Sequence, residues 1–482
     1  MQSSDDFLKE AHAVLGDRGL TRDPDLVEPW LTDWRGRYSG KALALASPAD
    51  TSQVAELMKL CAKAGVSIVP QGGNSGMSGG ATPDQTGASL LLSLRRLDTI
   101  DPIKPGSGRV TCGAGVVLQN LHEAADAAGL RFPLTLGGKG SATIGGLIST
   151  NAGGTQVLRH GTMRAQVLGL QAVLADGQVF DSLTPLKKDN RGFDLKQLMI
   201  GSEGTLGIVT GATLRLLPAI ARRSVMFVGL KRITDARKLL LHAQSEVGDV
   251  LEGFEVMPHH TLESVLDHYP DARDPLAGAH DWYALIELAA DKAGAEALEG
   301  QTEDFLASAF QAELLDDATI AASESQAEAL WHLRDGISAA ERAIGPAMQH
   351  DISVPVETMA NFVEHALPVM DAEFPGTKAV AFGHLGDGNV HFHVLAPPGA
   401  VRGEWEETEG KTISRKVHDL VTQWGGSISA EHGIGQMKRD ELGRLGDPAS
   451  LSILRGVKSA LDPQGLLNPG KLVPLAPAGA SV

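Results

Sequence analysis

Three histidines lie close together in the segment GHLGDGNVHFHV, residues 383–394. Two short apolar runs flank a loop of glycine, aspartate and asparagine, which is the pattern of an antiparallel hairpin. In such a hairpin His384 and His391 face each other across the turn. His391 and His393 share one strand face because they are two residues apart. The three imidazoles can therefore converge on one spot and bind a metal ion or a substrate.

A further ligand is needed, because a catalytic metal usually has three protein ligands and one open position. The segment SISAEHGIGQMKRDEL, residues 427–442, supplies the best candidate. Its alternating start predicts a strand that delivers Glu431 and His432 into a glycine turn. An isolated Glu-His pair is most often a solvated loop entrance, but a second histidine cluster in the same chain favours a functional site. Histidines together with a carboxylate or a further imidazole suit zinc, and manganese, cobalt or iron are compatible.

A basic side chain for an anionic substrate is available in WHLRDGISAAERAIG, residues 331–345. The helical pattern places Arg334 and Ser338 one turn apart on one face. A helical arginine is most often an exposed partner of an ion pair, so this segment alone leaves both interpretations open.

Three glycine-rich loops mark the first half of the chain: residues 70–80, 136–154 and 201–211. Each bares several backbone N–H groups with few side chains, as a loop that approaches a phosphate or a planar ring must. One such loop is usually a tight turn, but three within about 140 residues favour a large cofactor. No complete GxGxxG or GxxxxGK[ST] occurs, which disfavours a Rossmann site and a P-loop.

The elements around these loops alternate between helix and strand. In TSQVAELMKLCAKAG, residues 51–65, the apolar positions fall on one helix face; Asp50 or Thr51 can cap the start and Gly65 can end it, with Cys61 in the core. LGLQAVLADGQVF reads as a hairpin that turns at Asp176-Gly177, and a long strand runs toward Pro218. Glycine thins out beyond this point, which predicts a domain boundary near residue 218.

Bulk properties restrict the function further. A chain of 482 residues predicts two or three domains. A net charge of −17 argues against nucleic acid and anionic membranes as partners. Apolar runs are too short for a transmembrane segment, and the acidic N-terminus lacks a signal-peptide pattern. Cys61 and Cys112 have no CxxC neighbour, so we expect no disulfides, a reducing compartment and a cytoplasmic location.

The order and spacing of the three loops resemble the FAD-binding domain of the vanillyl-alcohol oxidase and PCMH flavoprotein superfamily. The resemblance extends to the FAD-linked oxidase C-terminal domain and is strongest to the D-2-hydroxyglutarate dehydrogenase and D-lactate dehydrogenase branch. It implies an α+β fold: a two-part PCMH-type FAD-binding domain, then an α+β substrate (cap) domain with an antiparallel sheet, and a C-terminal segment returning to the flavin. We expect an N-terminal helical segment at 1–40, the FAD domain at 41–218, the cap at 219–425 and the C-terminal segment at 426–482.

The resemblance also implies which residues contact FAD. Some relatives attach FAD through a histidine at the position that resembles Asn74, so the FAD here is expected to be non-covalent. The implied contacts are Gln71, Gly72, Gly73, Asn74, Ser75 and Gly76 at the pyrophosphate; Pro133, Leu136, Gly140, Ser141, Thr143, Gly145, Gly146, Asn151 and Gly153 along the pyrophosphate and isoalloxazine; Glu203, Gly204 and Ile208 at the adenosine; and Asn468 at the ring.

For the histidine cluster the resemblance implies a zinc-type divalent ion held by His384, His391 and Glu431. His432 is then the base at the substrate hydroxyl, which suits an imidazole with an unperturbed pKa of about 6.5. The substrate contacts are Arg334, Ser338, His393 and Gln349. Gln349 stands where the family often has lysine, so the cation that could bind a distal carboxylate of the substrate is missing here.

The expected activity is FAD-dependent, metal-assisted oxidation of an (R)-2-hydroxy acid to the 2-oxo acid. The first candidate substrate is 2-hydroxyglutarate, with D-lactate or D-malate as alternatives. The electron acceptor is expected to be an electron-transfer flavoprotein, a quinone or a cytochrome, and the chain is expected to form a homodimer. The competing interpretations are a flavoprotein oxidase or non-redox FAD enzyme of the same fold, a metal-dependent hydrolase and a binding protein.

Overall fold

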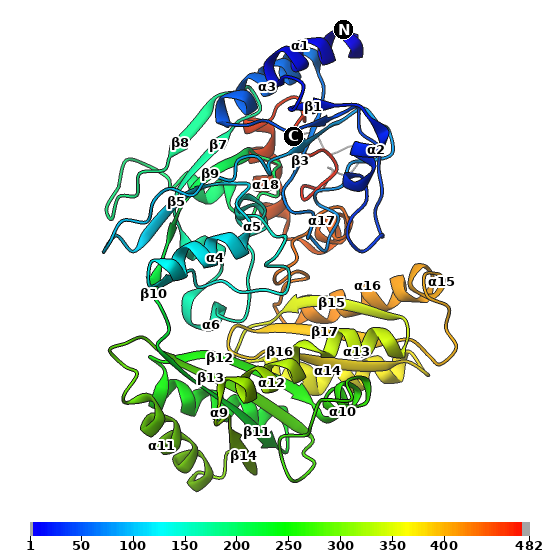
Figure 1. The fold of residues 1–482 in the computed structure, drawn as a ribbon. Helices are drawn as coiled ribbons and strands as arrows, with labels where there is room; N and C mark the ends of the chain where they lie inside the picture. Colours follow the sequence, from blue (N-terminus) through cyan, green and yellow to red (C-terminus); the bar gives the residue numbers. More distant parts are fainter. Residues whose placement is uncertain (1–2, 475–482) are drawn as a thin grey trace. The chain divides into compact units, whose positions relative to one another are not determined.

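The computed structural model describes residues 3–474, which form two compact units (Figure 1). The first unit contains the chain up to Gly154, then Gly161–Pro218, and the chain from Glu431 onward. The second unit contains Thr155–His160 and Ala219–Ala430. The outermost residues of the expected segments 1–40 and 426–482, namely 1–2 and 475–482, lie outside the described part.

The first unit contains two four-stranded sheets and a two-stranded ribbon. The first sheet has the order β1 (Leu20–Thr21), β2 (Leu45–Ala46), β4 (Leu90–Ser93), β3 (Ile68–Gln71), and β4 runs parallel to both of its neighbours. The second is antiparallel, in the order β5 (Arg109–Gly113), β9 (Ile208–Arg215), β7 (Val167–Val173), β8 (Val179–Ser182). The ribbon pairs β6 (Leu130–Arg131) with β10 (Leu217–Pro218).

The helices of the first unit cover these sheets and carry their loops. They are α1 (Ser4–Leu15), α2 (Pro24–Val27), the 3-10 helix η1 (Glu28–Trp30), α3 (Thr51–Ala64), α4 (Leu118–Ala127), α5 (Ile144–Thr150), α7 (Met163–Gln166), α8 (Lys196–Met199), α17 (Arg439–Leu445) and α18 (Pro448–Leu461). The short helix α6 (Val157–His160) belongs to the second unit.

Local sequence signals account for several of these elements. The side chain of Asp50 accepts a hydrogen bond from the backbone N–H of Gln53, and Gly65 ends α3 with φ of 70°. Cys61 lies in the core beneath this helix. Strands β7 and β8 pair across the Asp176-Gly177 turn, where Gly177 has φ of 82°. The predicted helix and hairpin are therefore confirmed.

The second unit is built on a seven-stranded sheet in which every pair of neighbours is antiparallel. This confirms the antiparallel sheet expected of the cap domain. Its order is β14 (Asp317–Ile320), β11 (Arg222–Leu230), β13 (Trp282–Ala290), β12 (Leu251–Pro258), β16 (Lys378–His384), β17 (Asn389–Leu395), β15 (Ala347–Ser353).

Helices pack on both faces of this sheet. A core joins α10 (His259–His268), α12 (Glu324–Asp335) and α13 (Ile337–Ile344) to one face, which includes Val380 and Phe382 of β16. The opposite face carries Phe392, whose ring lies 6.1 Å from that of Phe362 in α14 (Met359–Glu373). The remaining helices of the unit are α9 (Ile233–Val247), α11 (Leu298–Gln311), α15 (Glu404–Glu407) and α16 (Glu409–Gln423).

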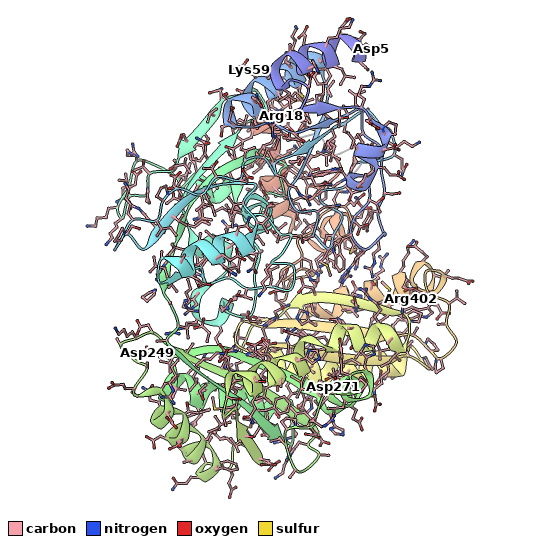
Figure 2. All side chains as sticks on the ribbon, viewed as in Figure 1. Asp5, Arg18, Lys59, Asp249, Asp271 and Arg402 are labelled. Atoms are coloured by element: carbon pink, nitrogen blue, oxygen red, sulfur yellow. The ribbon has the colours of Figure 1, made fainter. Side chains whose placement is uncertain are left out.

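Most charged side chains of the second unit lie outside, as Asp271 and Arg402 illustrate (Figure 2). A small group of acidic residues is buried instead: Glu252, Glu255, Glu287, Glu341 and Asp351 are each at most 8% exposed. Burying a carboxylate is costly unless it has hydrogen-bonding or charged partners. These buried acidic residues therefore mark candidate functional sites in this unit.

Two local predictions are wrong. Residues 427–430 form no strand, and only Ser427 makes an isolated bridge, to Ser353. The hydroxyl of Ser427 instead bonds with the backbone of Ser429, and such a local bond competes with sheet pairing. Arg334 and Ser338 do not share one helix, since α12 ends at Asp335 and α13 begins at Ile337, beyond Gly336.

None of the helices in residues 3–474 is long and apolar enough to cross a membrane. Cys61 and Cys112 are both free thiols in the interior. Burial raises the pKa of each thiol to about 12, so both stay protonated at neutral pH and act as apolar packing groups.

Candidate active site

The histidine hairpin forms as expected. Strands β16 and β17 pair so that Phe382 lies opposite His391 and His384 lies opposite Asn389. His384, His391 and His393 therefore share one sheet face with Phe382, while Phe392 faces the other way. The rings of His384 and His391 are 5.4 Å apart, so the two imidazoles converge as the spacing indicates.

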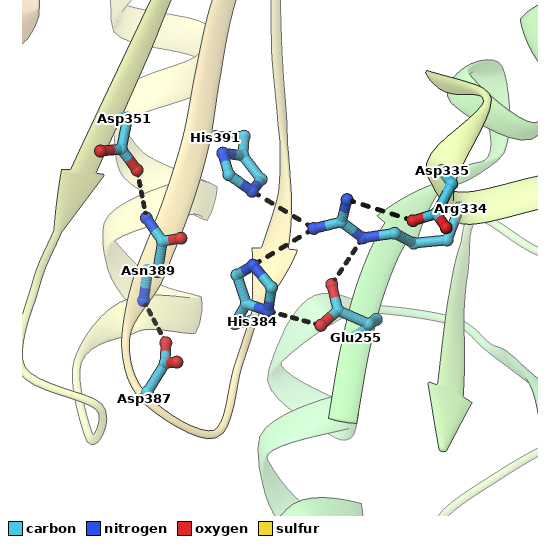
Figure 3. A network of polar contacts seen from close by, with 8 residues as sticks. All are labelled: Glu255, Arg334, Asp335, Asp351, His384, Asp387, Asn389 and His391. Carbon is cyan, nitrogen blue, oxygen red and sulfur yellow. Dashed lines mark hydrogen bonds and ion pairs between the residues drawn. The ribbon is translucent and has the colours of Figure 1, made fainter. Parts of the chain in front are cut away.

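The guanidinium of Arg334 points at both imidazoles (Figure 3). Its Nη2 is 3.2 Å from Nε2 of His384 and 3.2 Å from Nε2 of His391. Because a guanidinium only donates hydrogen bonds, both Nε2 atoms must be acceptors. The other side of the His384 ring points to Glu255, with Nδ1 at 2.5 Å from Oε1. His384 therefore donates through Nδ1 and keeps a lone pair on Nε2.

Glu255 is the buried anion of this cluster, at 1% exposure. It also accepts a hydrogen bond of 2.8 Å from Nε of Arg334. Burial opposes its ionised form, but Arg334 and His384 outweigh burial and hold the pKa of this carboxyl well below its usual range. Burial, followed by the charge of Arg334, lowers the pKa of His391 well below the ordinary value. His391 is therefore neutral at physiological pH.

These features fit a divalent metal. A neutral imidazole with a lone pair on Nε2 and a carboxylate behind its Nδ1 is the common arrangement of a metal-binding histidine. His384 has this arrangement with Glu255, and His391 offers a second neutral Nε2 within reach of the same point. His384 and His391 would hold a divalent ion through these nitrogens, where it would supply positive charge to a bound substrate.

Sequence reasoning missed Glu255, which lies in β12, more than a hundred residues before the hairpin. The signal that could have found it is a glutamate inside the otherwise apolar strand GFEVMP, because a buried charge needs partners. It also missed Asn389, whose side chain donates to Asp351 Oδ1 at 2.8 Å and to the carbonyl of Ile352 at 3.0 Å. Its backbone N–H donates to Asp387 Oδ1, which fixes the hairpin turn (Figure 3).

The predicted substrate residues occupy different environments. His393 is buried, and its Nδ1 lies 2.5 Å from Oε2 of Glu341, another residue that the sequence did not single out. Gln349 lies opposite His393 on the neighbouring strand β15. Ser338 is exposed on α13. The second unit thus brings together His384, His391 and Arg334, with His393 and Gln349 next along the strands.

The first unit concentrates unusual backbone at the predicted FAD contacts. Non-glycine residues with positive φ in residues 3–474 include Asn74 (54°), Asn151 (50°), Glu203 (51°) and Asn468 (42°). All four were predicted to contact FAD. Such conformations are costly and tend to occur at binding sites, where they aim backbone and side chains at a ligand.

The first two glycine loops pack directly against each other. A Cβ on Gly73 would lie 1.8 Å from the carbonyl oxygen of Ser141, and one on Gly72 would lie 2.2 Å from Oγ1 of Thr143. These two glycines are therefore required by the close approach of the loops. The side chain of Ile208 lies in the hydrophobic core. The other predicted contacts, namely Ser75, Gly76, Pro133, Leu136, Gly140, Gly145, Gly146, Gly153 and Gly204, all belong to this unit.

Buried acceptors in this unit fit an FAD. Within residues 3–474, Oε1 of Gln71, Oγ1 of Thr143 and Oδ1 of Asn468 are buried without a hydrogen-bond partner. The amide nitrogen of Gln71 donates to the carbonyls of Trp30 and Ala81, which fixes the direction of its oxygen. Asn468 is fixed likewise by bonds to the carbonyls of Gly80 and Glu203. The ribityl and ring N–H and O–H groups of FAD are suitable donors to these oxygens.

Glu203 supports the turn that carries His432. Its carboxylate accepts hydrogen bonds of 2.7 Å from the backbone N–H groups of Ile434 and Gly435, and burial raises its pKa. The hydroxyl of Ser78 donates to the carbonyls of His432 and Gly433. The carboxylate predicted to meet the adenosine thus holds a turn within the protein, and His432 is fixed to the first glycine loop. Both Glu431 and His432 belong to this first unit.

The family matches and relatives identify this chain as an FAD-dependent oxidoreductase. Residues 42–182 match the family model of an FAD binding domain, and residues 220–472 match that of the FAD linked oxidases, C-terminal domain. The chain belongs to the FAD-linked oxidase family.

Among its relatives is the mitochondrial D-2-hydroxyglutarate dehydrogenase of Arabidopsis thaliana, 34% identical over 96% of this chain and 80% of that protein. A putative mitochondrial D-lactate dehydrogenase of Schizosaccharomyces pombe is 33% identical over 94% of this chain and 85% of that protein. The crystal structure of p-cresol methylhydroxylase has the same fold, with a TM-score of 0.77 at 16% identity, and the match covers 98% of each chain.

The expectation of a cytoplasmic protein is wrong, because the plant and yeast relatives are named as mitochondrial proteins. Two unpaired cysteines indicate only a reducing environment, which is not specific to the cytosol.

Proposed function

We propose that this protein oxidises an (R)-2-hydroxy acid to the corresponding 2-oxo acid, with a divalent metal at His384 and His391 and non-covalent FAD. The observation that carries the proposal is the cluster of two imidazole Nε2 acceptors around the guanidinium of Arg334. A 2-hydroxy acid carries its hydroxyl and its carboxylate on adjacent carbons. The metal at the histidines and the neighbouring guanidinium of Arg334 can therefore bind these two groups together. The names of the relatives in Arabidopsis and fission yeast point to the same substrate class.

The residues of the second unit bind and orient the acid. Glu255 holds Nε of Arg334, and Nη2 points at the two imidazoles, so Nη2 is placed to donate to a substrate carboxylate bound beside them. Glu255 also keeps the proton of His384 on Nδ1, so that Nε2 remains a ligand. When bound, the divalent ion supplies charge that lowers the pKa of the substrate hydroxyl. FAD, when bound, supplies the two-electron acceptor that the oxidation needs.

Glu431 as the third metal ligand and His432 as the base remain predictions from the sequence. Two contacts within the first unit support the role of His432: Ser78 donates to the carbonyl of His432, and Glu203 accepts from the backbone N–H of Ile434. A base held in this way needs little reorganisation to take the hydroxyl proton. Zinc is the first choice of metal, with manganese, cobalt or iron as alternatives.

The first candidate substrate is 2-hydroxyglutarate. The alternatives are the shorter acids D-lactate and D-malate, because Gln349 stands where the family often has a lysine that could bind a distal carboxylate. The test is anaerobic reduction of the bound flavin, followed near 450 nm, on addition of each (R)-acid and its (S)-enantiomer. We expect bleaching by (R)-acids alone, its loss on chelation and its return with zinc, manganese or cobalt. Equal reduction by both enantiomers, or full activity of metal-free protein, would contradict the proposal.

The acceptor is proposed to be an electron-transfer flavoprotein, a quinone or a cytochrome. Reoxidation of the reduced flavin by each of these, measured beside oxygen and NAD, distinguishes them. Sedimentation of the purified protein tests the proposed homodimer.

A further inference from the structure

One row of residues lies next to the metal-binding histidines on the same sheet face. Gln349, His393 and Val380 pair across β15, β17 and β16, two residues along from the row of Asp351, His391 and Phe382. Rows of one face are about 7 Å apart along a strand. A small acid held by its 2-hydroxy carboxylate end at His384 and His391 can therefore bring its far end to His393 and Gln349.

This neighbouring row holds a buried carboxylate. Glu341 of α13 is 2% exposed, and its Oε2 is 2.5 Å from Nδ1 of His393, which is 5% exposed. The second oxygen, Oε1, is buried and has no hydrogen-bond partner among residues 3–474. Burying a carboxylate oxygen without a donor is costly. The arrangement therefore indicates that a ligand supplies a donor there.

The charges of this region oppose a second carboxylate. Gln349 is uncharged, and the guanidinium of Arg334 is bound to Glu255 and, in the proposed function, takes the carboxylate next to the 2-hydroxyl. A carboxylate brought to this row would meet the negative charge of Glu341, and like charges in a desolvated site discriminate strongly against a ligand. A hydroxyl could donate to Oε1 instead.

We propose that Glu341, with His393, determines the specificity of the proposed reaction and selects (R)-2-hydroxy acids with a hydroxyl at the far end over those with a second carboxylate. This inference rests on the proposed function and moves the preference within that class away from 2-hydroxyglutarate. Sites built to hydrogen-bond a substrate hydroxyl reject analogues that lack it, because their buried polar groups are then left without partners.

The test compares three acids of similar length: (R)-2,4-dihydroxybutyrate, (R)-2-hydroxybutyrate and (R)-2-hydroxyglutarate. We expect kcat/KM of the native protein to fall in that order, by about tenfold or more between the first and the last. Glu341→Gln should raise kcat/KM for 2-hydroxyglutarate and lower it for the dihydroxy acid, so that their ratio drops at least about tenfold. The matched control is Glu303→Gln, an exposed glutamate of α11, which should leave the ratio unchanged.

The order of kcat/KM for the three acids on the native protein tests the inference without any variant. If 2-hydroxyglutarate is the best of the three, the inference is overturned while the proposed function stands. If Glu341→Gln keeps its flavin content and leaves the ratio within twofold, the inference is also overturned. If none of the acids reduces the flavin, the proposed function itself fails. Glu341→Asp, which keeps the charge, should retain the native order, and a loss of that order would count against the inference.

Discussion

Replacing Glu255 by glutamine tests the central cluster most directly. The change keeps the shape of the side chain and removes the charge that Arg334 and His384 share at 2.8 Å and 2.5 Å. Removing one partner of a buried ion pair costs about 3–5 kcal/mol, and we expect the lower end, about 3 kcal/mol, because the amide oxygen still accepts one hydrogen bond. The supporting partner of a metal-binding histidine typically contributes about 10–100-fold in metal affinity.

Two measurements on Glu255→Gln check this reasoning. For a domain of roughly 150–250 residues, a loss of about 3 kcal/mol lowers Tm by about 6–12 °C. Calorimetry of chelator-treated protein should show that shift in the transition of the second unit. Competition with a fluorescent chelator should show zinc binding weakened about 10–100-fold. The exposed control Glu303→Gln should change stability by less than about 0.5 kcal/mol.

The dependence on pH has a defined sign. The pKa of Glu255 is depressed in the folded protein, so its stabilising contribution is present above the unfolded pKa, about 4.3, and is lost as the pH falls toward the folded value. Metal-free native protein should therefore lose stability more steeply below about pH 4.3 than Glu255→Gln. If the variant matches the native protein in Tm within 2 °C, in zinc affinity within about twofold and in pH profile, the account of the cluster is refuted.

Three further predictions concern the first unit. His432→Ala should lower kcat by at least about 100-fold with the 450 nm absorbance of bound FAD retained; unchanged turnover would remove His432 from the mechanism. Gly73→Ala should abolish FAD binding or folding, because its Cβ would lie 1.8 Å from the carbonyl of Ser141, and retention of full flavin content would contradict this packing. Asn468→Ala should raise the Kd for FAD by about tenfold, which corresponds to roughly 1.4 kcal/mol. The variant loses the hydrogen bonds of Asn468 to the Gly80 and Glu203 carbonyls and its bond to the cofactor. If equilibrium dialysis shows no change in the Kd, Asn468 does not have that role.

Several local features follow directly from neighbouring residues in the chain. Asp50 and Gly65 delimit α3, the Asp176-Gly177 turn joins β7 to β8, and the LGDGN loop joins β16 to β17. Each depends on capping, turn chemistry or strand alternation over a few residues. The wrong prediction of a strand at residues 427–430 also has a local cause. Alternation predicts a strand there, but the hydroxyl of Ser427 bonds to nearby backbone instead.

The sequence by itself determined the two-part architecture, the flavin class and the convergence of His384 with His391, because these depend on motifs and on strand periodicity. Only the tertiary structure decided what surrounds them. Glu255 reaches His384 from β12, and Glu341 reaches His393 from α13. The physical reason is that a buried charge is tolerated where distant strands and helices bring it partners. No local pattern in a single chain reveals those partners.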